Sequence, residues 1–497
     1  MAFTVKKLPV SIKHSLWSVL DAALYPAVYL ATVPLMLHSL GYVMFGLWIL
    51  LNSLITILQL FNFNSGIANL GIATIRNIST AKANNDIALA KDTINSILYI
   101  TTALLLFVVG IGVVLSYTTV KYGWWGLGDV QGINVSLCVL LTAIFAGLKY
   151  FDQVFQSIIK AYERFKMSSV LNMINRFGLL IINLTLALSG YSLVQMLFAN
   201  IIFICCYLIV QYICIKRIEP AYNVGRITDK TLYKQLVGIS MLPWVQSIII
   251  VCTFQTDRFW VSSYSGLKEV SGYGLASTMF NHVHMIFTAI AVWMLPRIAG
   301  MTSRGESPAQ LYDTVRNFLL GFIVISLLFF YFIAPPLIRF WIGADAFEQM
   351  YGYVKSFVAF EIVFAHTILP FFYLNAAGKE RLATKLTLMY CSLCYLFMLG
   401  ALWLFHSPMA MVAGMTLSLC ITMPIVNMIT HHAMHKQYSI IHAFLEMLPM
   451  YAAILLIYWG NSTWLYVGLV IVVLALLWKF YLSDLYNKRS WQRLPNT

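Results

Sequence analysis

Charged side chains are scarce in this sequence of 497 residues. Asp, Glu, Lys and Arg together make up 10% of it, whereas hydrophobic residues make up 60%. Water-soluble domains carry about 25% charged residues, so this composition excludes a soluble enzyme and is typical of a chain that folds in lipid. The connections between the apolar runs are also too short for a separate domain. We therefore expect any function to be carried by membrane-spanning helices.

The motifs of several catalytic classes are absent as well. The sequence has no nucleotide-binding loop, no H-E-x-x-H zinc motif and no nucleophile elbow. We therefore expect no enzyme activity and no cofactor, and transport driven by a gradient of H⁺ or Na⁺, by the substrate gradient or by both. His431, His432 and His435 resemble a metal cluster, but they follow an apolar run and are expected at the membrane surface. No metal site is predicted.

The cysteines give no sign of a disulfide framework. All eight fall within or at the ends of apolar runs, where they read as packing residues. Cys391 and Cys394 form a C-x-x-C pattern in the middle of such a run, with no soluble redox fold beside it. A structural role is therefore predicted for both.

What the sequence does contain is a series of long apolar runs. Each is long enough to cross a hydrocarbon core of about 30 Å as a helix. The sequence therefore predicts an all-α polytopic membrane protein with about fourteen transmembrane helices. The predicted spans are 16–39, 41–63, 95–117, 134–157, 168–189, 191–215, 237–256, 273–296, 316–340, 355–376, 382–405, 408–430, 442–460 and 463–482.

Positive charges alternate between the two ends of these spans. Lys and Arg gather in every second connection and are nearly absent from the connections between. Because such residues stay on the cytoplasmic side, both termini are predicted to be cytoplasmic. The net charge of +14 is spread over short inner connections, which favours anionic membrane lipid over nucleic acid as a partner. The exceptions are Lys121, Arg258, Lys268, Arg339 and Lys355 in outer connections, and Lys149 and Arg176 within predicted spans.

The two halves of the chain share a pattern. Ser15 begins a run that ends at Gly41, and Ser240 begins a run that ends at Gly266 with the same spacing. Internal repeats of this kind are common in transporters. Because both halves start inside, the repeat is parallel, with its pseudo-axis along the membrane normal. Further matches, in the same order, are Arg76 with Arg297 and Glu163-Arg164 with Glu380-Arg381.

The repeat predicts the organisation of the chain. We expect an N-terminal six-helix bundle at 1–236 and a pseudo-symmetric C-terminal six-helix bundle at 237–436. Residues 437–497 then supply two additional transmembrane helices and a cytoplasmic tail.

Several short segments point to a family. The segments Leu40–Tyr42, Phe45–Trp48 and Asn64–Ile67 resemble the start of the Wzx-type O-antigen and polysaccharide flippases of the multidrug/oligosaccharidyl-lipid/polysaccharide (MOP) exporter superfamily. That family often has an acidic residue before the glycine at the end of helix two, where this chain has Asn64 and Ser65. Three further similar segments are Asp257–Trp260, Gly266 with Gly272–Ala276, and Ala377–Arg381.

The resemblance implies a V-shaped, MATE-like pair of bundles that opens alternately to each side. It further implies a flippase in the bacterial inner membrane that moves an undecaprenyl-diphosphate-linked oligosaccharide, an O-antigen or related repeat unit, to the outer leaflet. A polysaccharide polymerase and a chain-length regulator are its expected partners. A multidrug cation antiporter of the same superfamily and a lipid II flippase remain alternatives, and a membrane glycan polymerase or ligase is a distant one.

Polar residues within the spans are the candidates for a cavity that binds a diphosphate and a glycan. Asn52, Thr56 and Gln59 form one stripe on helix two, which suits either a cavity or hydrogen bonding between helices. In helix eight, Asn281 and His282 are further candidates, although His282 and His284 point to different faces. The expected substrate-binding cations are Arg176, Lys149, Arg258, Arg76 and Arg297.

Acidic residues at membrane depth are candidates for ion coupling. Glu361 has no charged neighbour in the sequence and is the preferred candidate, five residues before His366. Asp21 precedes Pro26 on a helix that is expected to bend. Asp152 lies three residues after Lys149, so the two are close enough to neutralise each other. Asp257, next to Arg258 at an outer rim, suits an ion-pair gate or an outer substrate contact.

Overall fold

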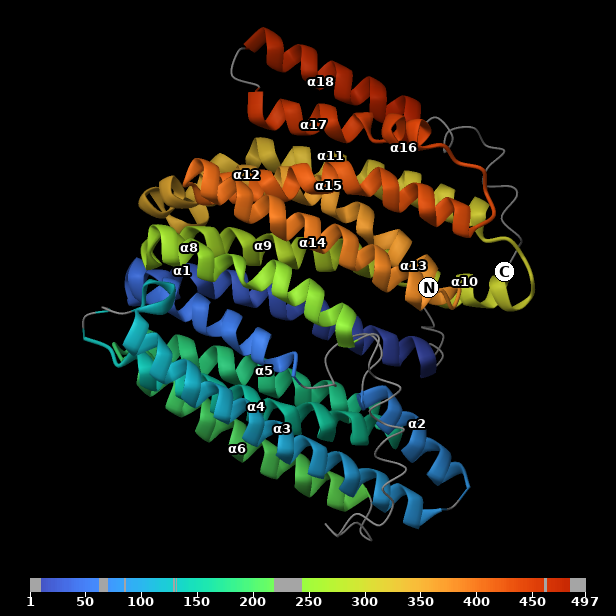
Figure 1. Cartoon of the computed structure of the whole chain (residues 1–497). Helices are drawn as coiled ribbons and strands as arrows, with labels where there is room; N and C mark the ends of the chain where they lie inside the picture. Colours follow the sequence, from blue (N-terminus) through green and yellow to red (C-terminus); the bar gives the residue numbers. More distant parts are fainter. Residues whose placement is uncertain are drawn as a thin grey trace, which may run out of the picture. The chain divides into compact units, whose positions relative to one another are not determined.

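The structure is a computed structural model that describes residues 10–61, 70–84, 86–127, 130, 132–218, 244–459 and 463–482. The side chains of 10–27, of Arg76 and of a few other residues are not among those described. Throughout the described ranges the regular structure is helical (Figure 1). The predicted all-α fold class is therefore confirmed.

Nine helical segments in the described part of the chain are long and apolar enough to cross a membrane, and a bent pair makes a tenth. The first predicted spans, 16–39 and 41–63, form one long helix, α1, which is broken at Gly41. Residues 244–255 are the described part of the predicted span 237–256. The bent pair is α16 (Ile440–Glu446) with α17 (Leu448–Trp459), which meet at 47°. Two short helices, α2 (Leu70–Ala83) and α10 (Met294–Ser303), lie in predicted inner connections.

The chain forms two compact units, Met1–Ser271 and Gly272–Thr497. The predicted boundary at 236 lies in a stretch outside the described residues, so it stays a prediction, as does the boundary at 436. Unit 1 contains α1 (Val10–Gln59), α2, α3 (Ile87–Tyr122), α4 (Val135–Ala161), α5 (Phe165–Leu188), α6 (Leu193–Ile218), residues 244–255 and α8 (Asp257–Ser265).

The core of unit 1 surrounds α4, which packs against α1, α2, α3 and α6. Two glycines let α3 and α4 approach closely. A Cβ atom on Gly112 would lie 2.3 Å from Ala143, and one on Gly147 would lie 2.3 Å from Leu105. Small residues at such contacts are the usual means of packing helices in lipid. The arrangement places Asp152, on α4, inside the bundle.

Unit 2 is built around a buried central segment, α12 (Ala344–Phe364) with its continuation α13 (Ile368–Ala376). Its neighbours are α11 (Ala309–Ile342), α15 (Pro408–Ala433) and α17, and α14 (Glu380–Phe405) pairs with α15. The terminal α18 (Thr463–Leu477) packs on α17, so the last two helices are joined to this unit (Figure 1). Glu361 lies on the central segment and is therefore shielded on all sides.

Gly41 and Gly266, which the repeat matched, adopt nearly the same backbone conformation. Their φ and ψ angles are 71° and 164°, and 82° and 172°. Residues other than glycine rarely adopt these backbone angles. Each glycine separates two helical segments. Gly41 divides the two parts of α1, and Gly266 lies between α8 and α9 (Leu267–Ala291). The two glycines thus match in their local backbone, whereas Ser240 lies outside the described residues and the repeat as a whole stays a prediction.

Candidate functional site

Three groups of buried polar side chains in the described helices contain an acidic residue that bonds to a neighbouring helix. One surrounds Asp152 in unit 1, one is the pair of His284 and Glu361 in unit 2, and one surrounds Arg316 at an end of unit 2. The first two lie well within membrane-spanning segments, where ionisable groups are costly and are functional candidates for that reason.

In unit 1, Asp152 is held by amide groups from two other helices. Its Oδ2 accepts a hydrogen bond of 2.8 Å from Asn175 on α5, and its Oδ1 accepts one of 2.9 Å from Gln211 on α6. The same Gln211 amide lies 3.0 Å from the hydroxyl of Tyr207. Because both carboxylate oxygens have donors, Asp152 is satisfied without a cation in direct contact.

Two predicted cations lie near this carboxylate. Lys149 and Arg176 are both close enough to Asp152 to act on it electrostatically, which brings three predicted site residues from α4 and α5 together. The ammonium of Lys149 lies over the ring of Phe145, 5.6 Å from its centre. No Lys149–Asp152 contact within ion-pair distance occurs among the described side chains, so the direct neutralisation that the spacing allowed is not seen.

Arg258 and Asp257 lie in the interior of unit 1, with 6% and 2% of their surfaces exposed. The Nη1 atom of Arg258 donates to the Ser53 hydroxyl of α1 at 2.8 Å, and its backbone N–H donates to Asp257. Nearby, the Ser262 hydroxyl donates to the carbonyl of Trp125, which joins α8 to the connection after α3. The gate and outer-contact roles of this pair stay predictions.

The polar stripe of helix two lies on the second part of α1. The Asn52 amide donates to the carbonyl of Trp48 at 2.8 Å, and the Thr56 hydroxyl donates to the carbonyl of Asn52 at 3.1 Å. Both bonds stay within one helix, so these two residues do not join helices in the described structure. Asn52 is exposed, whereas Thr56 and Gln59 are half-buried. For the stripe as a whole, which includes Gln59, a cavity lining and hydrogen bonding between helices both stay predictions.

In unit 2, His284 contacts Glu361. The Nδ1 atom of His284, on α9, lies 2.8 Å from Oε1 of Glu361, on α12. Glu361 is 1% exposed, and the His284 ring lies against Phe364 with 4.5 Å between ring centres. The isolation of Glu361 that its sequence neighbours suggested is therefore wrong. Of the two histidines that the sequence offered on this helix, His284 makes this contact, while Asn281 is exposed and His282 is half-buried.

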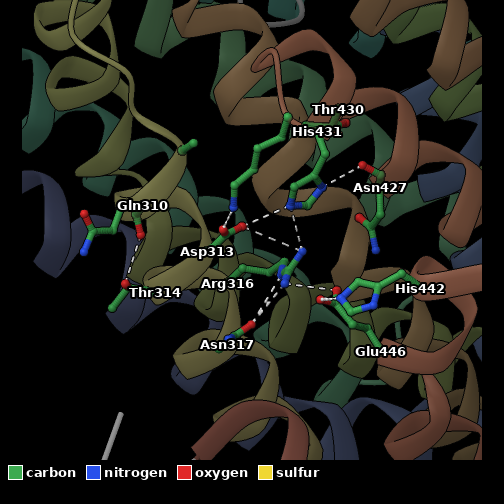
Figure 2. Close-up of polar contacts among 12 residues, drawn as sticks. Gln310, Asp313, Thr314, Arg316, Asn317, Asn427, Thr430, His431, His442 and Glu446 are labelled. Carbon is green, nitrogen blue, oxygen red and sulfur yellow. Dashed lines mark hydrogen bonds and ion pairs between the residues drawn. The ribbon is translucent and has the colours of Figure 1, made fainter. Parts of the chain in front are cut away.

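The third place is a cluster that the sequence did not reveal, here named the Arg316 cluster. It joins α11 to the end of α15 and to α16 (Figure 2). Arg316 lies 3.0 Å from Glu446 and 3.1 Å from the Nε2 atom of His431. That Nε2 atom also lies 3.0 Å from Asp313, which is paired with Lys436. Positive and negative groups are balanced here, so the cluster is a closed joint rather than an open ligand site.

The histidines at the end of α15 behave differently from one another. His431 is 1% exposed and is therefore buried inside unit 2, whereas His432 and His435 are exposed; the place of all three at the membrane surface stays a prediction. The His431 ring stacks on Tyr438 with 4.1 Å between centres. Burial raises the pKa of the Tyr438 hydroxyl, so it stays neutral. In the described part of the chain, no three His, Cys, Asp or Glu side chains gather as a metal site requires.

Three predicted site residues remain to be placed. Arg297 is half-buried and lines a pocket between α10 and α11. The side chains of Asp21 and Arg76 lie outside the described residues, so their roles stay predictions. The roles of the partners Asn175, Gln211 and His284 depend on which helices pack together.

No protein-family model matches the chain, and no curated protein sequence matches it. Solved structures do. The inward closed conformation of the lipid II flippase MurJ matches 96% of this chain and 100% of its own, with a TM-score of 0.64 and 12% identity. An inward-facing multidrug resistance MATE family transporter of the MOP superfamily matches 83% of this chain and 96% of its own, with a TM-score of 0.59 and 12% identity.

A mutant of the Vibrio cholerae MATE transporter VcmN matches 85% of this chain and 95% of its own, with a TM-score of 0.55 and 17% identity. These proteins are transporters and flippases. The described part of the chain has at least nine helices long and apolar enough to cross a membrane, and its fold is similar to that of these solved transporters and flippases. Membership of the MOP superfamily, which the sequence segments predicted, is not established by this likeness. The Wzx-type branch stays a prediction.

Proposed function

We propose that the chain is a flippase that moves an undecaprenyl-diphosphate-linked oligosaccharide, an O-antigen or related repeat unit, from the inner to the outer leaflet by alternating access. The observation that carries the proposal is the neighbourhood of Asp152. Two cations, Lys149 and Arg176, share it with one carboxylate that is already bonded to amides. The formal charge within this part of unit 1 is therefore positive.

A positive site inside the membrane suits a diphosphate. A guanidinium binds phosphate oxygens in a forked geometry, and an ammonium adds a point charge that can follow the group as it moves. An exporter of organic cations would instead favour acidic and aromatic groups in its cavity. The prenyl tail needs no polar path, because it can stay in lipid while the head group crosses.

Coupling to protons is proposed at the His284–Glu361 pair. A buried carboxyl next to an imidazole can exist with its proton on either group, which suits a site that takes up and releases one proton per cycle. Asp152 is the weaker candidate, because both of its carboxylate oxygens already accept hydrogen bonds from amides, whereas Glu361 faces an imidazole that can exchange a proton with it.

Two other functions each have an observation in their favour. A lipid II flippase is supported by the match to MurJ over 96% of this chain. A multidrug cation antiporter is supported by the MATE matches and by the buried acid Glu361. In each case we place the protein in the bacterial inner membrane with both termini in the cytoplasm. For the glycan flippase we further propose a polysaccharide polymerase and a chain-length regulator as partners.

The deciding experiment measures leaflet transfer of an undecaprenyl-diphosphate oligosaccharide in proteoliposomes. We expect transfer by the intact chain and a loss of at least about tenfold in Arg176→Ala, because charge-assisted hydrogen bonds to phosphate are strong. Arg164→Ala, which removes an exposed arginine just before α5, is the matched control and should transfer normally. If the intact protein moves no glycolipid but exports small cations against a proton gradient, the antiporter replaces the flippase.

A further inference from the structure

Unit 2 contains a pocket of about 200 Å³ between the end of α9, the start of α10 and the first turns of α11. Its walls are almost entirely apolar. One guanidinium, that of Arg297, stands among them, and Thr314 uses its hydroxyl to donate to the Gln310 carbonyl of its own helix (Figure 2). The residues that shape the pocket are Ile290, Trp293, Arg297, Leu311, Val315 and Phe318.

The pocket lies near the water-facing end of the helices. The connection that follows α10 holds an ion pair between Arg304 and Glu306, whose side chains are 61% and 47% exposed. Trp293 is itself partly exposed, and tryptophan is the residue most typical of the boundary between head groups and hydrocarbon. A ligand in the pocket would therefore have its polar end among head groups and its apolar end in the hydrocarbon.

One wall of the pocket is fixed from behind by the Arg316 cluster. Leu311, Val315 and Phe318 lie on one face of the first turns of α11, and Asp313 and Arg316 lie on the opposite face. Because the opposite face is bonded to α15 and α16, this part of α11 is held in place. The pocket is thus built on a rigid support.

The lining selects the chemistry of the occupant. Apolar walls with a single guanidinium fit a hydrocarbon chain that carries a phosphate. At about 200 Å³ the pocket is smaller than the roughly 300–1,000 Å³ of sites that enclose a whole drug-sized ligand, so it holds only a segment. In a polyprenyl diphosphate the hydrocarbon begins one oxygen away from the phosphate, whereas a phospholipid places a glycerol group between them. Because the cation of the pocket lies directly beside its apolar wall, the pocket favours the polyprenyl diphosphate.

We propose that this pocket binds the first part of the polyprenyl chain of the lipid-linked substrate in the inner leaflet, with Arg297 on the adjacent phosphate. This inference rests on the proposed function and adds a docking step before translocation. Among the described residues, the Arg297 guanidinium forms no ion pair or hydrogen bond with another side chain, so it is available for the diphosphate. Trp293 and Phe318 provide aromatic surface for the methyl-branched chain.

The test uses a photo-crosslinker in place of Phe318, which lines the pocket, and in place of Phe329 as control. The two positions are eleven residues apart on α11, so they lie on the same helix face at depths about 16 Å apart. The full chain is placed in phosphatidylcholine vesicles that contain undecaprenyl diphosphate without a glycan and no ion gradient. We expect an adduct with the prenyl lipid at 318 and little at 329.

Two variants of the pocket and one control sharpen the result. Arg297→Ala should lower the adduct at 318 by about tenfold, since it removes a charge-assisted contact, while Arg304→Ala removes a nearby cation outside the pocket and should leave it unchanged. Val315→Phe fills the pocket without altering charge and should also lower the adduct. Normal elution of each variant from a sizing column establishes that it is folded.

Equal adducts at 318 and 329 would show ordinary lipid contact and overturn the proposal. So would full competition by phosphatidylglycerol at the same concentration, which would assign the pocket to a resident phospholipid. Because crosslinking needs neither glycan nor gradient, it does not depend on transfer. A protein that crosslinks but does not flip leaves the docking site standing and removes the proposed flippase activity.

Discussion

The Nδ1 atom of His284 lies 2.8 Å from the carboxyl oxygen of Glu361, and this contact joins α9 to the buried centre of unit 2. Uptake or loss of a proton by these two groups would change the charge of the unit's interior. Any step that exposes the pair to one side of the membrane would let it load or release that proton. Substitutions at this pair can therefore test the driving force of transfer without changing the proposed substrate-binding cations.

We expect Glu361→Gln to remove the dependence of transfer on a proton gradient. Glutamine has nearly the same shape but cannot ionise, so packing is retained while proton uptake is lost. General acid–base groups typically contribute about 100-fold or more, and a loss of at least about tenfold in gradient-driven transfer is expected. Transfer is measured in proteoliposomes with and without an imposed pH difference.

Glu348→Gln, the same change at an exposed position of α12, is the control for that comparison. Transfer in Glu361→Gln that still responds to the pH difference as the intact protein does would rule out coupling at the pair.

Asp152→Asn should keep its response to the gradient, in contrast to Glu361→Gln. The side-chain oxygens of Asn175 and Gln211 are buried without a hydrogen-bond partner in the described structure, so one amide can turn and accept from the new asparagine. Asp152→Ala leaves two buried donors unsatisfied and should lower the free energy of unfolding by about 1–3 kcal/mol for each. Thermal unfolding in detergent measures the second effect; if the asparagine and alanine variants melt alike, the hydrogen-bonded role is excluded.

Glu446→Gln should weaken the attachment of α16 to α11. It removes one charge of a largely buried pair with Arg316, and breaking such a pair costs about 3 kcal/mol or more. The melting temperature should fall clearly. Glu348→Gln is the matched control, because it breaks a pair with Arg339 that is mostly exposed and contributes no more than about 1 kcal/mol. Equal melting temperatures for the two variants would contradict the cluster's role as a joint.

Alanine substitutions should separate two kinds of glycine on α1. At Gly46 a Cβ atom would lie 2.0 Å from the carbonyl oxygen of Leu267, so Gly46→Ala should strongly reduce the yield of folded protein. At Gly41 a Cβ atom meets open space, and the cost is the backbone strain of its positive φ, about 1–3 kcal/mol. Purified yield and melting temperature measure the difference; a Gly46→Ala protein as stable as Gly41→Ala would show that the close approach is not required.

The sequence predicted the parts of this structure that follow from solvent and local geometry. Apolar length predicted the helices, and the spacing of Ser15 with Gly41 and Ser240 with Gly266 located two glycines with matching backbones. Depth in the membrane marked Glu361 and Asp152 as unusual, and both are buried. These features depend only on the helix in which a residue lies, so they can be predicted from a single sequence.

Contacts between helices were harder to foresee. The spacing of Lys149 and Asp152 suggested an ion pair, yet donors from α5 and α6 reach the carboxylate instead. On α9 neither His282 nor His284 stood out as the partner of Glu361, because the partner is set by the helix face that meets α12. Arg316 read as a cation of an inner connection, and its partners Glu446 and His431 come from far along the chain. Helix packing decides each of these outcomes.

The Arg316 cluster has a consequence for motion. Because it fastens α11, α15 and α16 at one point, and α17 packs on α11, α12 and α16, the last two spans are tied to the rest of unit 2. We therefore expect them to follow any displacement of α12, the helix that carries Glu361. A fluorophore placed on exposed Trp459 should then register the motion of the buried His284–Glu361 pair, from a position that light and reagents can reach.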